Sequence, residues 1–283
     1  MTTPTPPAAA TAPAAAPTLP AQPPAGSGGR DTVSQLAYLT RVLRAPAARD
    51  SYERLAATAR EQAWTYEEYP AAVLHSEAAA REDHGTATRL RRAGFPALKT
   101  LEDFDFAHAP DLDRQLIVHL AMADFVTERS NVVLLGPPGT GKTHLAIALG
   151  VRAAQAGHKV TFATASHWIM RLARAHNAGT LEQELRRLAR IPLMIIDEVG
   201  YIPFDTGAAN LMFHLVASRY EAAATIVTSN RAFSRWAEIF TDEVVATTIA
   251  DRLVHHADVI ALNGDPYRLT NHRTARHTAL PNR

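Results

Sequence analysis

Cysteine is absent from the 283 residues of this chain. Disulfide bonds and metal sites built from thiolates are therefore excluded. Long hydrophobic runs are absent too, because no stretch approaches the roughly 18 apolar residues that a membrane-spanning helix requires. The N-terminal residues show neither the positively charged start nor the apolar stretch of a secretory signal. We therefore expect a cytoplasmic protein that does not enter a membrane.

Lysine is rare, and Lys99, Lys142 and Lys159 are the only lysines. Arginine supplies most of the positive charge, and the formal net charge is only +1 at pH 7. A total so close to zero argues neither for nor against a nucleic-acid partner. The histidines show no pair at positions i and i+4 accompanied by an acid, so the sequence gives no sign of a zinc site.

The composition changes along the chain and indicates its organisation. Residues 1–31 are mainly proline, alanine, threonine and glycine, which cannot bury enough apolar surface to offset the entropy of ordering, so we expect a disordered tail. Residues 32–100 show the apolar spacing of helices, broken by prolines, which predicts a helical N-terminal domain of about three helices. Residues 101–114 form an acidic connector, residues 115–275 form a second domain, and residues 276–283 form a C-terminal tail.

Strands and helices alternate in the second domain, which predicts an α/β fold with a parallel sheet between helices. We expect its first helix over 115–128 and a later helix that Ser166 caps. The other expected helices cover 142–156, 208–221 and a stretch that begins near 242. The expected strands are 132–135, 160–164, 193–196 and 225–228, followed by a short strand that ends near Leu262.

A glycine-rich loop follows the first expected strand and fits the pattern G-x-x-x-x-G-K-S/T in full. Its glycines allow the backbone to aim successive N–H groups at phosphates, and the helix that follows directs its positive end at the same anion. The pattern predicts an ATP site in which Lys142 bridges the terminal phosphates and Thr143 binds magnesium. His144 begins the helix and is expected to pack there rather than to catalyse. The predicted nucleotide-binding residues are Gly136, Pro137, Pro138, Gly139, Thr140, Gly141, Lys142, Thr143 and His144.

Two further strands end in polar residues of the kind that complete an ATPase. The apolar run that ends at Ile196 is followed by Asp197, which we expect to hold magnesium, and by Glu198, which we expect to orient or deprotonate the attacking water. The strand over 225–228 is followed by Ser229 and Asn230, and Asn230 has the position of the polar sensor that reaches the γ-phosphate in AAA+ ATPases. Together with the glycine-rich loop, these residues predict ATP hydrolysis.

Several arginines are candidates for further contacts. Arg252 lies on a helix beyond the nucleotide core and is a candidate arginine finger for a neighbouring subunit, while Arg268 is a candidate sensor on a C-terminal lid. Both can instead be ordinary surface residues. Two groups can contact DNA phosphates or be plain solvated faces. The first is Arg89, Arg91, Arg92 and Lys99, and the second is Arg171, Arg174, Arg186, Arg187 and Arg190.

Beyond these general motifs, the chain resembles the IstB-like group of insertion-sequence ATP-binding proteins over about residues 33–275. The resemblance implies an AAA+ P-loop fold related to the DnaA and DnaC ATPases. The segments that carry it are LEDFDF at 101–106, GPPGTGKTHLAIALG at 136–150, IIDEVGYIPFD at 195–205, IVTSN at 226–230 and DRLVHHADVI at 251–260.

This resemblance implies a transposition helper that assembles with ATP and Mg²⁺ on double-stranded DNA of little sequence specificity. It also implies a homo-oligomer with nucleotide at the subunit interfaces, and recruitment or stimulation of a transposase partner, in which the helical N-terminal domain contacts transposase or DNA. Arg252 matches the arginine finger in the DRL segment. Arg268 matches the arginine of a terminal S-Y-R motif, in which this chain has Pro266 in place of serine.

Other functions compete with this interpretation. A replicative helicase loader of the DnaC type has the same ATPase core and would be distinguished by its partner. A GTPase would need a guanine-reading N-K-x-D sequence after the last core strands, and a kinase would need an acceptor site and lid; neither is visible. A nucleotide-dependent scaffold without turnover would not need Glu198.

Overall fold

The computed structural model describes residues 29–240 and 242–263. The predicted tails at 1–31 and 276–283 lie wholly or almost wholly outside these residues, as does Arg268. The chain forms two compact units that divide between Ala80 and Arg81. In the described part of the chain, no helix is both long enough and apolar enough to cross a membrane.

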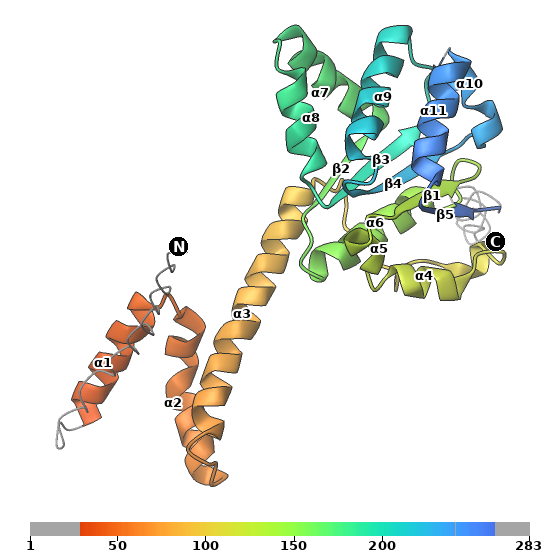
Figure 1. Cartoon of the computed structure of the whole chain (residues 1–283). Coiled ribbons are helices and arrows are strands. Elements are labelled where there is room, and N and C mark those ends of the chain that lie inside the picture. Colours follow the sequence, from red (N-terminus) through yellow and green to blue (C-terminus); the bar gives the residue numbers. More distant parts are fainter. Residues whose placement is uncertain (1–28, 241, 264–283) are drawn as a thin grey trace, which may run out of the picture. The chain divides into compact units, whose positions relative to one another are not determined.

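The N-terminal unit consists of helices (Figure 1). It contains α1 (Gly29–Val42), α2 (Pro46–Glu61) and the first half of α3 (Glu68–Ala93). The carboxylate of Glu77 on α3 accepts the backbone N–H groups of Ala47 and Ala48 at 2.9 and 3.1 Å, in the first turn of α2. This contact satisfies two of the N–H groups that the start of a helix leaves unpaired, and it joins α2 to α3.

The second unit is built on a five-stranded sheet in the order β2-β3-β4-β1-β5, in which all pairs are parallel. This finding confirms the predicted α/β fold. The strands are β1 (Asn131–Leu135), β2 (Val160–Thr164), β3 (Leu193–Val199), β4 (Ala224–Ser229) and β5 (Ala257–Ala261).

Helices cover both faces of this sheet (Figure 1). Side chains alternate along β1, so Val132 and Leu134 join one buried cluster and Val133 joins the other. One face is covered by α6 (Lys142–Gln155) and by the chain between residues 93 and 126, which includes the 3₁₀ turn η1 (Phe106–His108). The opposite face is covered by α7 (Ala165–Asn177), α8 (Leu181–Ala189), α9 (Thr206–Arg219), η2 (Phe233–Arg235), α10 (Ala237–Phe240) and α11 (Glu243–Val254).

Two details differ from the sequence prediction. The helix expected over 115–128 is split into α4 (Arg114–Leu120) and α5 (Asp124–Thr127), because Ala123 adopts a left-handed backbone conformation with φ 65°. The residue that caps α7 is Thr164 rather than Ser166, since the Thr164 hydroxyl accepts the N–H of His167 and the helix already begins at Ala165.

Candidate functional site

The glycine-rich loop lies between the carboxyl end of β1 and the first turn of α6, as its pattern requires. Gly136 has φ 147° and Gly141 has φ 94°, conformations that side chains disfavour. Packing also excludes a side chain at position 141, because a Cβ atom at Gly141 would come within 2.6 Å of the Phe104 ring. Both glycines are therefore required for the tight path of the loop.

Lys142 is almost fully buried at the start of α6, and its ammonium group donates to the carbonyl oxygen of Pro137 at 2.6 Å. Burial lowers the pKa of this ammonium group, and the charge of Asp197 partly opposes the shift. The loop therefore holds a desolvated positive charge next to the N-terminus of a 14-residue helix. Both features favour an anionic ligand.

Thr143 and Asp197 are brought together from two different elements, α6 and β3. The Thr143 hydroxyl lies 2.9 and 3.2 Å from the two carboxylate oxygens of Asp197, whose side chain is buried. A hydroxyl and a carboxylate are oxygen ligands of the kind that Mg²⁺ prefers. The donor set at this position therefore suits a magnesium ion.

Thr228 on β4 connects the two acidic residues that follow the apolar part of β3. Its hydroxyl donates to Asp197 Oδ1 at 2.6 Å and accepts the backbone N–H of Glu198 at 2.9 Å. Glu198 itself is exposed and has φ 61°, at a point where the register between β3 and β4 shifts. Thr228 was not among the residues predicted for the site; its position at the end of the strand before Asn230 was the available signal.

Asn230 directly follows β4, at the carboxyl end of this strand. Its side-chain oxygen is buried, and it is one of two buried side-chain atoms within the described residues that have no hydrogen-bond partner. The preceding Ser229 donates to the carbonyl oxygen of Val199 at 2.8 Å and accepts the N–H of Arg231. These bonds hold the chain next to Asn230, whose free acceptor remains available to a ligand.

Arg252 lies near the amino ends of the strands, opposite the carboxyl ends where the glycine-rich loop begins. Asn131, the first residue of β1, donates its side-chain N–H to Leu253 O at 3.1 Å and its backbone N–H to His256 O, so the end of α11 lies beside the beginning of β1. The five residues of β1 rise about 3.3 Å each, so roughly 15 Å separates the amino end of β1 from the glycine-rich loop. The guanidinium of Arg252 stacks over Phe213 at 4.7 Å, and its Nη1 is the second buried atom without a partner.

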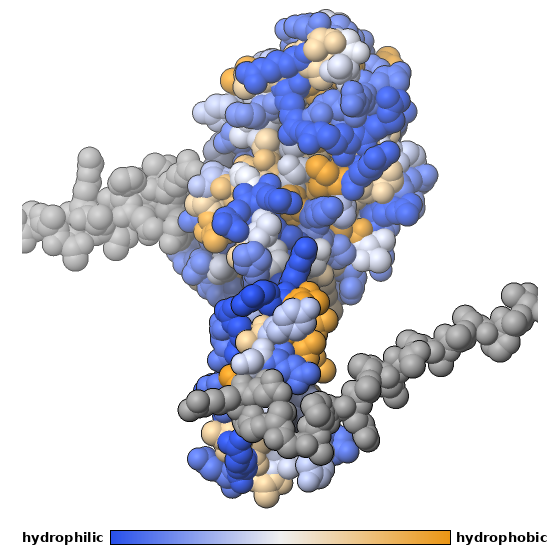
Figure 2. Space-filling model, turned by 90° about the vertical axis from the view of Figure 1, so that its left-hand side faces the viewer, coloured by the Kyte–Doolittle hydropathy of each residue, from blue (hydrophilic) through white to orange (hydrophobic). Residues whose placement is uncertain are grey.

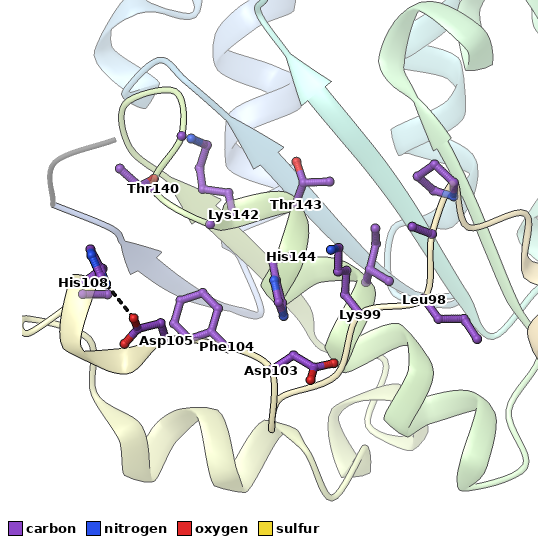
Figure 3. A pocket seen from close by; sticks show the side chains of 16 residues that line it. Leu98, Lys99, Asp103, Phe104, Asp105, His108, Thr140, Lys142, Thr143 and His144 are labelled. Atoms are coloured by element: carbon purple, nitrogen blue, oxygen red, sulfur yellow. Dashed lines mark hydrogen bonds and ion pairs between the residues drawn. The ribbon is translucent and has the colours of Figure 1, made fainter. Parts of the chain in front are cut away.

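A cavity of about 470 Å³ borders the glycine-rich loop (Figure 3). Figure 3 shows Phe104, Asp105 and His108 on one side of the loop that carries Thr140 and Lys142. His108 Nδ1 and Asp105 Oδ2 are 2.7 Å apart. Residues 101–114 were predicted to be a connector, and nothing in their spacing indicated that part of them lines a cavity.

His144 belongs to this wall of the cavity rather than to the phosphate side. Its Nε2 lies 2.8 Å from Thr100 O, and its ring meets Phe104 edge to face with centroids 5.3 Å apart. The side chain therefore holds residues 100–104 against α6, and an ion pair between Arg152 and Glu102 supports the same attachment.

Three of the five arginines predicted between β2 and β3 pair with two neighbouring acids. Glu184 pairs with Arg171 at 2.6 Å and with Arg187 at 2.9 Å, and Glu182 pairs with Arg186 at 3.2 Å. The part of the surface formed by these helices is predominantly hydrophilic (upper part of Figure 2). In the other basic group, Arg89 donates to Ala154 O at 2.7 Å. Exposed cationic residues remain at Arg91, Arg92, Lys99, Arg174 and Arg190.

Comparison with known proteins gives consistent results. The model of the family described as IstB-like ATP binding protein matches residues 39–275. The chain is 44% identical over 223 residues to the insertion sequence IS21 ATP-binding protein of Pseudomonas aeruginosa, a match that covers 79% of this chain and 84% of the relative. It is 37% identical to the IS5376 ATP-binding protein of Geobacillus stearothermophilus, with 82% and 92% of the two chains covered.

Solved structures share the fold. A DNA replication initiation factor superposes with a TM-score of 0.50 at 20% identity, and covers 65% of this chain and 56% of its own. AMPPCP-bound DnaA from Aquifex aeolicus gives a TM-score of 0.50 at 19% identity, with 67% and 57% covered. The chain thus matches a little over half of each of these two proteins, and at such identities the likeness concerns the fold alone.

Proposed function

Because the chain belongs to the IstB-like ATP binding protein family, we propose that it is an ATPase that assists the transposition of an insertion sequence. In this proposal it assembles with ATP on double-stranded DNA, with little sequence preference, and recruits or stimulates a transposase. The observation that carries the proposal is the convergence of Lys142, Thr143 and Asp197 at the carboxyl edge of the sheet.

The terminal phosphates of ATP bind between the glycine-rich loop and the first turn of α6. Lys142 exchanges its hydrogen bond to Pro137 O for the β- and γ-phosphates. The desolvated ammonium group gains more from an anion than an exposed lysine would, because the surrounding medium screens the interaction less. The backbone amides at the start of α6 complete the cradle.

The water-activating part of the site is formed by the ends of β3 and β4. Thr143 and Asp197 hold Mg²⁺, which neutralises charge on the β- and γ-phosphates when it is bound. Glu198 orients the attacking water and accepts its proton. Asn230 uses its unpartnered oxygen toward this water or donates from its amide nitrogen to the γ-phosphate. Thr228 keeps Asp197 and the backbone of Glu198 in place.

The nucleoside end of ATP enters the cavity beside the loop. A volume of about 470 Å³ is large enough for a base, and the cavity walls offer the imidazole of His108 and the apolar side chains of Ala109 and Ile147. His108 and Asp105 form a polar pair that can read an exocyclic amine or a ring nitrogen. Residues 100–109 are therefore a part of the ATP site in this proposal.

Arg252 serves the ATP site of a neighbouring subunit. It lies at the amino edge of the sheet, roughly 15 Å from the loop of its own chain, so its side chain cannot reach its own phosphates. An arginine supplied in trans stabilises the charge of the transferring phosphoryl group and makes hydrolysis depend on assembly. This position supports a homo-oligomer with nucleotide at its interfaces.

DNA contacts are assigned to the exposed arginines and to Lys99. Three of the five arginines between β2 and β3 pair with Glu182 and Glu184, so the exposed arginines of this group without an ion pair among the described residues are Arg174 and Arg190. Phosphate contacts of this kind depend steeply on salt and carry little sequence information.

The experiment that tests the proposal measures ATP hydrolysis with and without duplex DNA over a range of protein concentrations. We expect the rate per subunit to rise with concentration and with DNA, and DNA affinity to fall steeply as salt increases. The transposase encoded beside the gene should co-purify with the ATP-bound protein. Co-purification with a hexameric helicase instead would favour the loader function, and the absence of hydrolysis under every condition would contradict the ATPase assignment.

A further inference from the structure

Two adjacent histidines at the end of α11 face an acidic residue at the end of α9. His255 is the C-cap of α11, His256 precedes β5, and Glu221 lies in the connection from α9 to β4. His255 Nδ1 is 3.9 Å and His256 Nε2 is 4.0 Å from the same carboxylate oxygen of Glu221. One ligand atom from each of the three residues can be chosen so that all lie within 4.8 Å of one another.

The end of the helix explains how two neighbouring residues converge. In a continuing helix their side chains would point about 100° apart, since a turn contains 3.6 residues. Because α11 stops at Val254 and the chain then turns into β5, the two imidazole rings instead meet edge to face with centroids 4.3 Å apart. The third residue lies in the connection that follows α9, a helix that packs beside α11 (Figure 1).

We propose that Glu221, His255 and His256 form a binding site for a divalent transition-metal ion of the Zn²⁺ class. Two imidazoles and one carboxylate are donors that suit Zn²⁺, Ni²⁺ or Cu²⁺, whereas Mg²⁺ prefers oxygen ligands. Zinc–ligand bonds of about 2.0–2.1 Å place tetrahedral donors about 3.3 Å apart. The three side chains are each more than half exposed, so they can close the remaining distance by rotation.

Tyr220 contacts the same nitrogen of His255 that faces Glu221. Its hydroxyl lies 2.9 Å from His255 Nδ1. Because Nδ1 is also the atom 3.9 Å from the Glu221 carboxylate, a metal ion bound by this nitrogen replaces the contact with Tyr220.

Three protein ligands leave at least one coordination position for water or another group. The bound ion would link the α9–β4 connection to the α11–β5 connection, and so would fix the end of the helix that carries Arg252. Two neighbouring arginines weaken cation binding, since Arg129 donates to Glu221 O at 3.2 Å and Arg252 lies near Tyr220. The site does not depend on the proposed ATPase activity.

The test is a titration of the metal-free full chain with Zn²⁺ by calorimetry, in buffer that contains Mg²⁺. Visible absorption of the Co²⁺-loaded protein reports tetrahedral nitrogen and oxygen coordination. We expect one equivalent to bind, and the thermal midpoint to rise with Zn²⁺ as it does for any ligand of the folded state. Tyr220→Phe should not weaken binding, because the Tyr220 hydroxyl contacts Nδ1 only in the metal-free protein.

Three variants remove single ligands: His255→Ala, His256→Ala and Glu221→Gln. Each should abolish the saturable binding and the thermal shift while the circular dichroism spectrum stays unchanged. Two controls should bind as the wild type does, namely His119→Ala, an exposed histidine on α4, and the double variant His272→Ala/His277→Ala beyond the described residues. Failure to bind one equivalent, or binding that survives all three ligand substitutions, would overturn the proposal.

Discussion

The hydroxyl of Thr228 donates to the buried carboxylate of Asp197 across 2.6 Å and at the same time accepts the N–H of Glu198. One hydroxyl thus orients the side chain of the first acid and the backbone of the second. Glu198 has a left-handed conformation, with φ 61°, that a non-glycine residue adopts only when its surroundings hold it there. Strand β4 therefore determines the geometry of two residues of β3.

Replacement of Thr228 by valine removes the hydroxyl while the shape of the side chain is kept. The buried oxygen of Asp197 and the N–H of Glu198 then each lose a partner, and we expect a loss of about 1–3 kcal/mol in stability. ATP binding should be retained, with kcat reduced by roughly 10-fold or more because Glu198 is no longer held. Thr228→Ser, which keeps the hydroxyl, is the control. Equal kcat for Thr228→Val and the wild type would rule out the positioning role.

Replacement of Lys142 by alanine should abolish nucleotide binding, measured by fluorescence of a labelled ATP analogue. The wild-type affinity should also depend on pH. Burial lowers the pKa of Lys142, and bound phosphates raise this pKa again. At pH values where Lys142 of the free protein is partly deprotonated, ATP binding is therefore coupled to the uptake of a proton. Affinity should therefore fall as pH rises through the lowered pKa. Lys142→Arg should show no such fall, and tight binding by Lys142→Ala would contradict the assignment of the loop.

Glu198→Gln should bind ATP and assemble, but hydrolyse slowly, because the amide cannot accept a proton from water. We expect a decrease in kcat of roughly 100-fold or more with an unchanged Kd for ATP. The exposed Glu243 at the start of α11 offers a control with the same substitution. Undiminished turnover in Glu198→Gln would remove Glu198 from the mechanism.

Arg252→Ala should retain ATP binding but lose the part of the ATPase rate that depends on assembly, by about 10³-fold or more. Its own site stays intact and lacks only an arginine from the neighbour. Mixing with Lys142→Ala subunits should restore part of the activity. The Lys142→Ala subunit then supplies Arg252 to the intact nucleotide site of an Arg252→Ala neighbour. A mixture without any gain would show that Arg252 does not act in trans. Thermal unfolding of the variant checks the loss of the contact with Phe213.

Arg219 is expected to be important for stability rather than for chemistry. Its buried guanidinium donates to four neutral oxygens at 2.6–3.1 Å, and burial lowers its pKa to about 10, so it remains charged at neutral pH. Arg219→Met leaves these buried acceptors unpaired, which should cost about 2–4 kcal/mol. Urea denaturation measures this loss. Arg174→Met, on the exposed face of α7, should change stability by less than about 0.5 kcal/mol.

The local motifs made the fold predictable. A buried strand followed by a glycine-rich loop and a helix has one compact arrangement, because the loop has to turn sharply and the helix has to cover the strand. The strand predicted over 160–164 has the same bounds in the structure, and the strand predicted over 193–196 is extended by three residues to Val199. Alternation of such units indicated a parallel sheet, which the structure confirms.

Contacts between distant residues were not visible in the sequence. Thr228 reaches Asp197 only because β4 lies next to β3 in the order β2-β3-β4-β1-β5, and no local pattern specifies that order. The left-handed conformation of Glu198 depends on the same neighbour. Likewise, residues 100–109 become a wall of the cavity only when Phe104 packs against Gly141.

The sequence by itself determined that this chain has a phosphate-binding loop, two acids after a buried strand and a polar residue after another, because each of these depends on residues that are neighbours along the chain. The tertiary structure decided which of these residues are in contact. It also placed Arg252 near the amino ends of the strands, away from Lys142, and brought Glu221 close to His255 and His256. The physical reason is that hydrogen bonding and packing across a sheet act between residues far apart in sequence, and their pairing follows from the order of the strands.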